Sequence, residues 1–126
     1  MTGSSQGASR RGRYVLVVED EWLIADAVAH QLSGAGFEVV GPVPTLAKAR
    51  RLLETSTIDA AVLDLRLADE ATYPLAAELA GRSIPFLFLT GHNREDIDPA
   101  FRGRPCIGKP LADGALPPML DELLRL

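Results

Sequence analysis

The sequence has little cysteine and no long hydrophobic stretch. Its 126 residues include a single cysteine, Cys106, which permits no internal disulfide and suits a reducing compartment such as the cytoplasm. No apolar run approaches the roughly 20 residues that a membrane-spanning helix needs. These absences predict a soluble, cytoplasmic protein, and we interpret Cys106 as a small residue that fills part of the core.

Basic residues are scarce outside the N-terminus. Arg10, Arg11 and Arg13 lie in the first thirteen positions, which hold no acid, so the rest of the chain has 10 basic and 17 acidic residues and a net charge of −7. Nucleic-acid binding needs a basic face, and we therefore expect no binding to DNA. The composition predicts a disordered tail over 1–12 and a single folded domain over 13–126.

Patterns typical of buried strands and of amphipathic helices alternate along the chain. This alternation predicts an α/β fold with a parallel sheet and helices on both of its faces, joined by right-handed crossovers. Five strand and helix pairs are expected: strands at 14–18, 37–40, 59–65, 84–89 and 105–108, and helices at 21–33, 45–54, 71–80, 96–101 and 116–125.

Polar side chains lie at the ends of four of these five strands. Glu19 and Asp20 follow the first strand, Asp64 ends the third, Thr90 follows the fourth, and Lys109 follows the fifth. In open parallel sheets, ligands bind beyond the carboxyl ends of the strands. We therefore expect these five residues to gather at one edge of the sheet.

The chemistry of this group points to a metal and a phosphoryl group. Three carboxylates repel one another unless a cation joins them, and oxygen ligands suit Mg²⁺. Asp64 is placed to attack phosphorus, while Lys109 would neutralise the phosphoryl oxygens. Thr90, followed by Gly91, offers a hydroxyl to another phosphoryl oxygen. Taken singly, the acids are typical of a helix start and the lysine of a solvated surface.

The residues that carry this pattern resemble the receiver domain of bacterial two-component response regulators. The resemblance covers about residues 13–126 and depends on five positions in order, each at the end of a predicted strand. These are E-D at 19 and 20, D at 64, T at 90, and K-P at 109 and 110.

The resemblance implies a flavodoxin-like (βα)5 fold with strand order 2-1-3-4-5. It implies that Asp64 accepts a phosphoryl group from a sensor histidine kinase or phosphotransfer protein. Mg²⁺ would be held by Glu19, Asp20, Asp64 and the backbone carbonyl of Arg66, and the Lys109–Pro110 peptide would be cis. The domain would catalyse only its own phosphorylation and dephosphorylation, so it is not a conventional enzyme.

The fourth strand resembles that of a narrower group of stand-alone receivers. PFLFLTGH at 85–92, with the later KPL, is similar to their PFxFATGY pattern, from which it departs at Leu89 and His92. Cys106 stands where other receivers carry an aromatic switch residue, so we expect the conformational change to pass through Thr90 and the residues after it. His92 is placed to contact the entry path of the phosphoryl group.

Only one predicted helix follows Lys109, so we expect the signal to pass to a separate protein. The resemblance implies a partner surface made of the fourth helix, fifth strand and fifth helix, at 96–101, 105–108 and 116–125. The last helix has more apolar positions than one buried stripe needs, which is compatible with a homodimer or with extra core burial. Trp22 is expected near the metal, on the first turn of the first helix; partial core packing is the alternative interpretation, and the two are compatible.

Three other classes of protein remain as alternatives. The main alternative is a pseudo-receiver, a partner-binding adaptor of the same fold that is never phosphorylated. A phosphatase with an aspartate nucleophile usually has a second aspartate two positions later, where this chain has Arg66. A flavin or dinucleotide protein is disfavoured because the glycines at 34 and 36 precede a strand instead of opening a helix.

Overall fold

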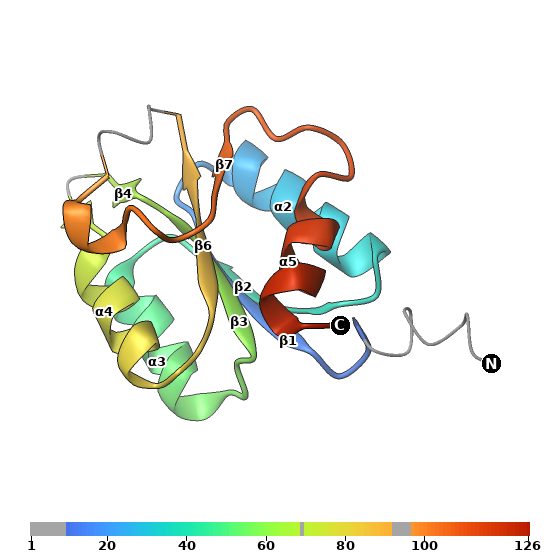
Figure 1. Cartoon of the computed structure of the whole chain (residues 1–126), viewed down its shortest axis with the longest axis horizontal. Helices are drawn as coiled ribbons and strands as arrows, with labels where there is room; N and C mark the ends of the chain where they lie inside the picture. Colours follow the sequence, from blue (N-terminus) through green and yellow to red (C-terminus); the bar gives the residue numbers. More distant parts are fainter. Residues whose placement is uncertain (1–9, 69, 92–96) are drawn as a thin grey trace.

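The structure is a computed structural model that describes residues 10–68, 70–91 and 97–126. Figure 1 shows a central sheet with α3 and α4 on its left and α2 and α5 on its right. The strands are β1 (Tyr14–Val18), β2 (Glu38–Val43), β3 (Ala60–Asp64), β4 (Arg66–Leu67), β5 (Glu70–Ala71), β6 (Phe86–Thr90) and β7 (Cys106–Gly108); the helices are α2 (Trp22–Gly34), α3 (Leu46–Thr55), α4 (Tyr73–Gly81) and α5 (Leu116–Leu124).

Five parallel strands form the main sheet in the order β2-β1-β3-β6-β7. Counted along this sheet alone, the order is 2-1-3-4-5, and the higher labels arise because the two-stranded hairpin β4–β5 intervenes in the sequence. The predicted flavodoxin-like α/β fold is therefore confirmed. The Lys109–Pro110 peptide is cis, as the resemblance implied, and Gly41–Pro42 is cis as well.

The central strands are buried because both faces of the sheet are covered. Along β1, Leu16 and Val18 pack into one core cluster with α3 and α4, while Val15 and Val17 pack into the other with α2 and α5. Strands β3 and β6 are buried at every position. Continuous apolar runs with no polar alternation are what a strand with two covered faces requires.

The connection between β6 and β7 differs from the expected helix at 96–101. Among its described residues, the regular structure is a short 3-10 helix, η2 (Pro99–Phe101). Asp98 caps it, because its Oδ1 accepts a hydrogen bond of 3.0 Å from the Ala100 amide. Pro99 lacks an amide hydrogen, so it suits the first turn of a short helix and disfavours a longer helix that would run through it.

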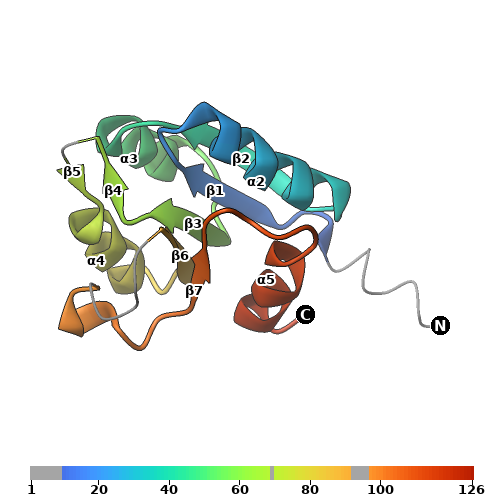
Figure 2. The same ribbon diagram turned by 90° about the horizontal axis from the view of Figure 1, so that it is seen from above.

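The hairpin β4–β5 was not predicted from the sequence. It consists of two residues on each strand, with Arg66 paired to Ala71 and Leu67 paired to Glu70. Figure 2 shows it at one end of the molecule, beside α4. The hairpin fills the connection from β3 to α4, so it borders the place where the expected site residues meet.

Arg10 belongs to the folded body, upstream of the predicted boundary at residue 13. Its Nε and Nη2 donate hydrogen bonds of 2.9 and 2.6 Å to the two carboxylate oxygens of Asp121 on α5. Its Nη1 donates to the backbone oxygen of Ala35 at 3.2 Å, and the guanidinium lies 5.6 Å from the centre of the Phe37 ring. The hydrogen bond to Asp121 raises the pKa of Arg10. The predicted tail over residues 1–9 lies outside the described residues.

In the part of the chain that the structure describes, every helix is too short or too polar to cross a membrane.

Candidate functional site

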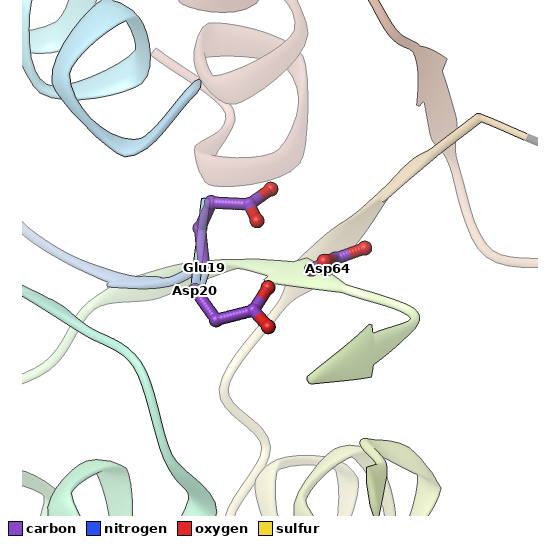
Figure 3. A group of neighbouring side chains, drawn as sticks. All are labelled: Glu19, Asp20 and Asp64. Atoms are coloured by element: carbon purple, nitrogen blue, oxygen red, sulfur yellow. The ribbon is translucent and has the colours of Figure 1, made fainter. Parts of the chain in front are cut away.

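The acidic residues meet at the carboxyl ends of β1 and β3. Glu19 and Asp20 directly follow β1, and Asp64 is the last residue of β3, which pairs with β1 in parallel. One carboxylate oxygen from each residue lies within 4.8 Å of the others. Figure 3 shows the three side chains extending from these strand ends toward a common region. The predicted gathering of the acids is confirmed.

Lys109 reaches the acids from the end of β7, which β6 separates from β3 in the sheet. Its Nζ lies 2.9 Å from Glu19 Oε1, 3.1 Å from Asp64 Oδ1 and 3.6 Å from Glu21 Oε1. Its side chain is 13% exposed, and its backbone amide donates a hydrogen bond of 2.9 Å to the Thr90 carbonyl. The end of the fifth parallel strand therefore delivers a nearly buried cation to the carboxylates.

Glu19 is the most buried member of the cluster, with 2% of its surface exposed. Burial raises the pKa of its carboxyl group to about 7, and the charge of Asp64 acts in the same direction, while the Glu21 amide and Lys109 oppose the rise. Its Oε1 lies 2.9 Å from Lys109 Nζ and accepts no hydrogen bond from any other described group. This oxygen has unused capacity for a cation.

Lys109 remains a cation in this setting. Burial alone would lower its pKa, but the hydrogen bonds and charges of Glu19 and Asp64 outweigh burial and raise the pKa above its ordinary value. A lysine that stays protonated is suited to neutralise charge on a phosphoryl oxygen.

Backbone groups fix the orientation of the acids. Glu19 Oε2 accepts a hydrogen bond of 3.0 Å from the Glu21 amide, at the start of α2. Asp20 Oδ2 accepts one of 2.8 Å from the Ala68 amide, in the turn between β4 and β5. Ala68 has a positive φ of 51°, a conformation that few non-glycine residues adopt. The unpredicted hairpin therefore has a role in holding one of the acids.

Thr90 and Arg66 border the same hollow as Asp64 and Lys109. A cavity of about 190 Å³ lies at this edge of the sheet and is open on one side. Thr90 itself is 6% exposed. The residues that line the cavity are Glu21, Asp64, Leu65, Arg66, Thr90, Gly91 and Lys109.

Thr72 is a residue that the sequence reading missed. It is fully buried, and its Oγ1 donates a hydrogen bond of 2.7 Å to the Asp64 backbone carbonyl. Its position before Tyr73-Pro74 is typical of a helix cap, but its side chain makes no capping hydrogen bond and points back to β3 instead. Sequence alone signals the helix start and gives no sign of the contact with the strand.

The remaining candidates are less central. His92 lies outside the described residues. Cys106 is half-buried on β7 and packs against the core cluster that contains Phe86 and Phe88, as a core-filling residue would. Trp22 lies on the first turn of α2, as expected, but the prediction of partial core packing is wrong, because 75% of its surface is exposed.

Comparisons with known proteins agree with this geometry. A sequence model of the response regulator receiver domain matches residues 15–116. The chain is 31% identical to the transcriptional regulatory protein PdtaR of Mycobacterium tuberculosis over 99 residues, which are 77% of this chain and 48% of PdtaR. The chain thus spans about half the length of this curated relative.

Solved structures give the same result. The solution structure of SdrG from Sphingomonas melonis Fr1 is 39% identical, with a TM-score of 0.74 over 90% of this chain and 93% of SdrG. The BeF3-activated conformation of SdrG, from Pseudomonas melonis Fr1, is 40% identical, with a TM-score of 0.77 over 88% of this chain and 95% of that one. Because the family match covers most of its length, the chain belongs to the response regulator receiver domain family of two-component signalling.

Proposed function

We propose that this chain is a stand-alone phospho-acceptor receiver, in which Asp64 takes a phosphoryl group from a sensor histidine kinase or phosphotransfer protein. The observation that carries the proposal is the position of Asp64. The residue is 7% exposed and borders an open cavity, and its Oδ1 lies 3.1 Å from Lys109 Nζ. A nucleophilic carboxylate beside a fixed cation is suited to phosphoryl transfer.

The transfer needs few groups. A carboxylate oxygen of Asp64 would attack the phosphorus of a phosphohistidine, and the phosphorus–nitrogen bond would break with its electron pair leaving on the imidazole. Lys109 would stabilise the charge on one phosphoryl oxygen, and the Thr90 hydroxyl would donate to another. Hydrolysis of the resulting acyl phosphate by water would return the free carboxylate.

The acidic cluster fits a divalent metal. Three carboxylate oxygens within 4.8 Å, one of them on a buried residue with a raised pKa, form a set that a cation would stabilise. Glu19, Asp20 and Asp64 would hold Mg²⁺ together with the backbone carbonyl of Arg66. When bound, the metal supplies positive charge that neutralises phosphoryl oxygens.

Binding of Mg²⁺ should weaken as the pH falls below 7. The folded-state pKa of Glu19 lies near 7, above its ordinary value. The protonated carboxyl group therefore stabilises the metal-free fold fully below about pH 4.5, and this stabilisation is lost as the pH rises through 7. Mg²⁺ competes with that proton. Calorimetric titration should give an affinity about tenfold lower at pH 6 than at pH 8.

Matched variants separate Glu19 from other acids in this titration. Glu19→Gln should weaken binding at pH 8 and flatten its dependence on pH. Glu54→Gln, which changes an exposed acid on α3, should leave both unchanged. A wild-type affinity that is equal at pH 6 and pH 8 would contradict the role of Glu19.

Beryllofluoride, which mimics a phosphoryl group on an aspartate, tests the proposed acceptor. Fluorine NMR should show a bound signal in the wild type that requires Mg²⁺ and disappears in Asp64→Asn. Asp59→Asn provides the control, because Asp59 lies at the opposite end of β3, where it accepts a hydrogen bond from the Tyr14 amide. A wild type that binds no beryllofluoride would favour the unphosphorylated adaptor instead.

Signal output through protein contacts would use the surface around β7. The expected face of fourth helix, fifth strand and fifth helix corresponds here to η2, β7 and α5. On α5, Met119, Leu123 and Leu124 are half-buried and pack against the core, so extra core burial accounts for part of the apolar excess that the sequence shows. A partner or a second copy of the chain would contact the remaining exposed part, with no DNA involved.

A further inference from the structure

The start of α4 contacts both the end of β3 and the connection between β6 and β7. Thr72 precedes the helix and holds the end of β3, where Asp64 lies. Tyr73, the first residue of the helix, contacts the connection between β6 and β7. These two neighbouring residues therefore lie between the candidate phosphorylation site and residues 97–101.

Thr72 donates hydrogen bonds to the backbone at the end of β3 from both its side chain and its amide. Its Oγ1 lies 2.7 Å from the Asp64 carbonyl oxygen and 3.2 Å from that of Leu65. Its amide donates a further hydrogen bond of 3.0 Å to the Leu65 carbonyl. Because Thr72 is fully buried, water does not compete for these contacts.

Tyr73 docks the segment that contains η2. Its phenol oxygen accepts a hydrogen bond of 2.8 Å from the Asp98 amide. Its ring is stacked on Phe101, with centroids 5.5 Å apart and planes at 7°, and meets Phe88 edge-on at 6.2 Å. The hydrogen bond is exposed, which is typical of a contact that opens at low cost.

No aromatic side chain lies on β7, which runs from Cys106 to Gly108. A ring on that strand therefore cannot report the state of Asp64. Thr72 and Tyr73 offer a different route, because they are adjacent residues at the start of one helix and a displacement of one would carry the other with it. A shift of the Asp64–Leu65 backbone when a phosphoryl group binds would pull on Thr72 and displace Tyr73 relative to Asp98 and Phe101.

We propose that Thr72 and Tyr73 together transmit the state of Asp64 to residues 97–101. This inference rests on the proposed function, since it assumes that Asp64 is the acceptor. It requires the contact between Tyr73 and the η2 segment to have a closed and an open form. Asp64 at one end of the route and residues 97–101 at the other must both shift the equilibrium between these forms.

The test compares amide NMR spectra with and without beryllofluoride and Mg²⁺. In the wild type, the Asp98 and Ala100 amide signals should shift on binding. Thr72→Val keeps the shape of the side chain and removes its hydroxyl. This variant should still give the bound fluorine signal, while the shifts at Asp98 and Ala100 fall to less than half of the wild-type values.

Three further variants isolate the effect. Thr72→Ser should restore the shifts, because it keeps the hydroxyl. Thr55→Val removes an exposed hydroxyl that donates to the Arg51 carbonyl on α3, and it should behave as wild type. Tyr73→Phe keeps the stacking ring and should bind beryllofluoride normally, while the shifts at Asp98 and Ala100 on binding fall to less than half of the wild-type values. It should also speed hydrogen exchange at Asp98 about fivefold, the equilibrium change expected for one lost hydrogen bond.

The outcomes distinguish this inference from the function beneath it. Shifts of wild-type size in both Thr72→Val and Tyr73→Phe, with beryllofluoride bound, would overturn the route and leave the phospho-acceptor intact. A wild type that binds no beryllofluoride would contradict both the route and the assignment of Asp64 as the phospho-acceptor. If Thr72→Val fails to fold, the Tyr73→Phe result alone decides, because that change lies at an exposed contact.

Discussion

The Lys109→Met variant should become phosphorylated about a hundredfold more slowly than the wild type when it is supplied with a small acyl phosphate and Mg²⁺. Lys109 Nζ lies within 3.1 Å of both Glu19 and Asp64, so in the proposed transfer it would supply a fixed positive charge where negative charge develops. Methionine keeps much of the length of the side chain and removes the charge. The rate of mass gain measures the effect directly.

The chain contains one matched control, because its second lysine is Lys48. Lys48 is exposed on α3 and is not among the residues that line the cavity, so Lys48→Met should be phosphorylated at the wild-type rate. Equal rates for Lys109→Met and the wild type would show that the ammonium group has no part in the transfer.

Lys109→Met should also destabilise the metal-free protein in a way that depends on pH. At pH 8, Glu19 and Asp64 would face each other without their cation, and we expect a loss of about 2 kcal/mol, less than for a fully buried pair because one side of the site is open. At pH 5.5, Glu19 is protonated in the wild type and the loss should shrink. Urea unfolding at both pH values tests whether the loss of unfolding free energy is smaller at pH 5.5 than at pH 8.

Phe88→Ala should cost about 3 to 5 kcal/mol of unfolding free energy, the largest stability effect that we expect from one substitution. Phe88 is fully buried on β6, and its ring lies edge-on to Phe86 at 5.5 Å, Phe101 at 6.1 Å and Tyr73 at 6.2 Å. Alanine would leave a cavity under the η2 segment and two residues before Thr90.

An exposed apolar residue provides the comparison. Leu23 on α2 is 67% exposed, so Leu23→Ala should change the unfolding free energy by less than about 0.5 kcal/mol. Urea denaturation of the two variants measures both. A loss below about 1 kcal/mol for Phe88→Ala would mean that this part of the core is loosely packed.

The sheet, and the edge of it where the candidate site lies, could be predicted because the sequence patterns that indicate them are local. Continuous apolar runs identify strands that are covered on both faces, and the observed bounds of β1 match the predicted range. Once a parallel sheet is inferred, all strands share one carboxyl edge. Asp64 and Lys109 could therefore be brought together from the sequence, although 45 positions separate them.

The parts that sequence did not predict depend on contacts between distant residues. The hairpin β4–β5 is too short to have a period, and it is held through the hydrogen bond from Ala68 to Asp20. Arg10 is ordered by Asp121, which lies 111 positions away. Trp22 was expected to pack partly in the core, but it lies to one side of the buried stripe of α2 and at its exposed end.

Intact mass spectrometry after incubation with Mg²⁺ and a small acyl phosphate tests the central claim most directly. Wild type should gain the mass of one phosphoryl group, and the gain should be absent in Asp64→Asn and in wild type without Mg²⁺. A wild type that gains no mass, or an Asp64→Asn variant that gains as much as the wild type, would contradict the assignment of Asp64 as the phospho-acceptor.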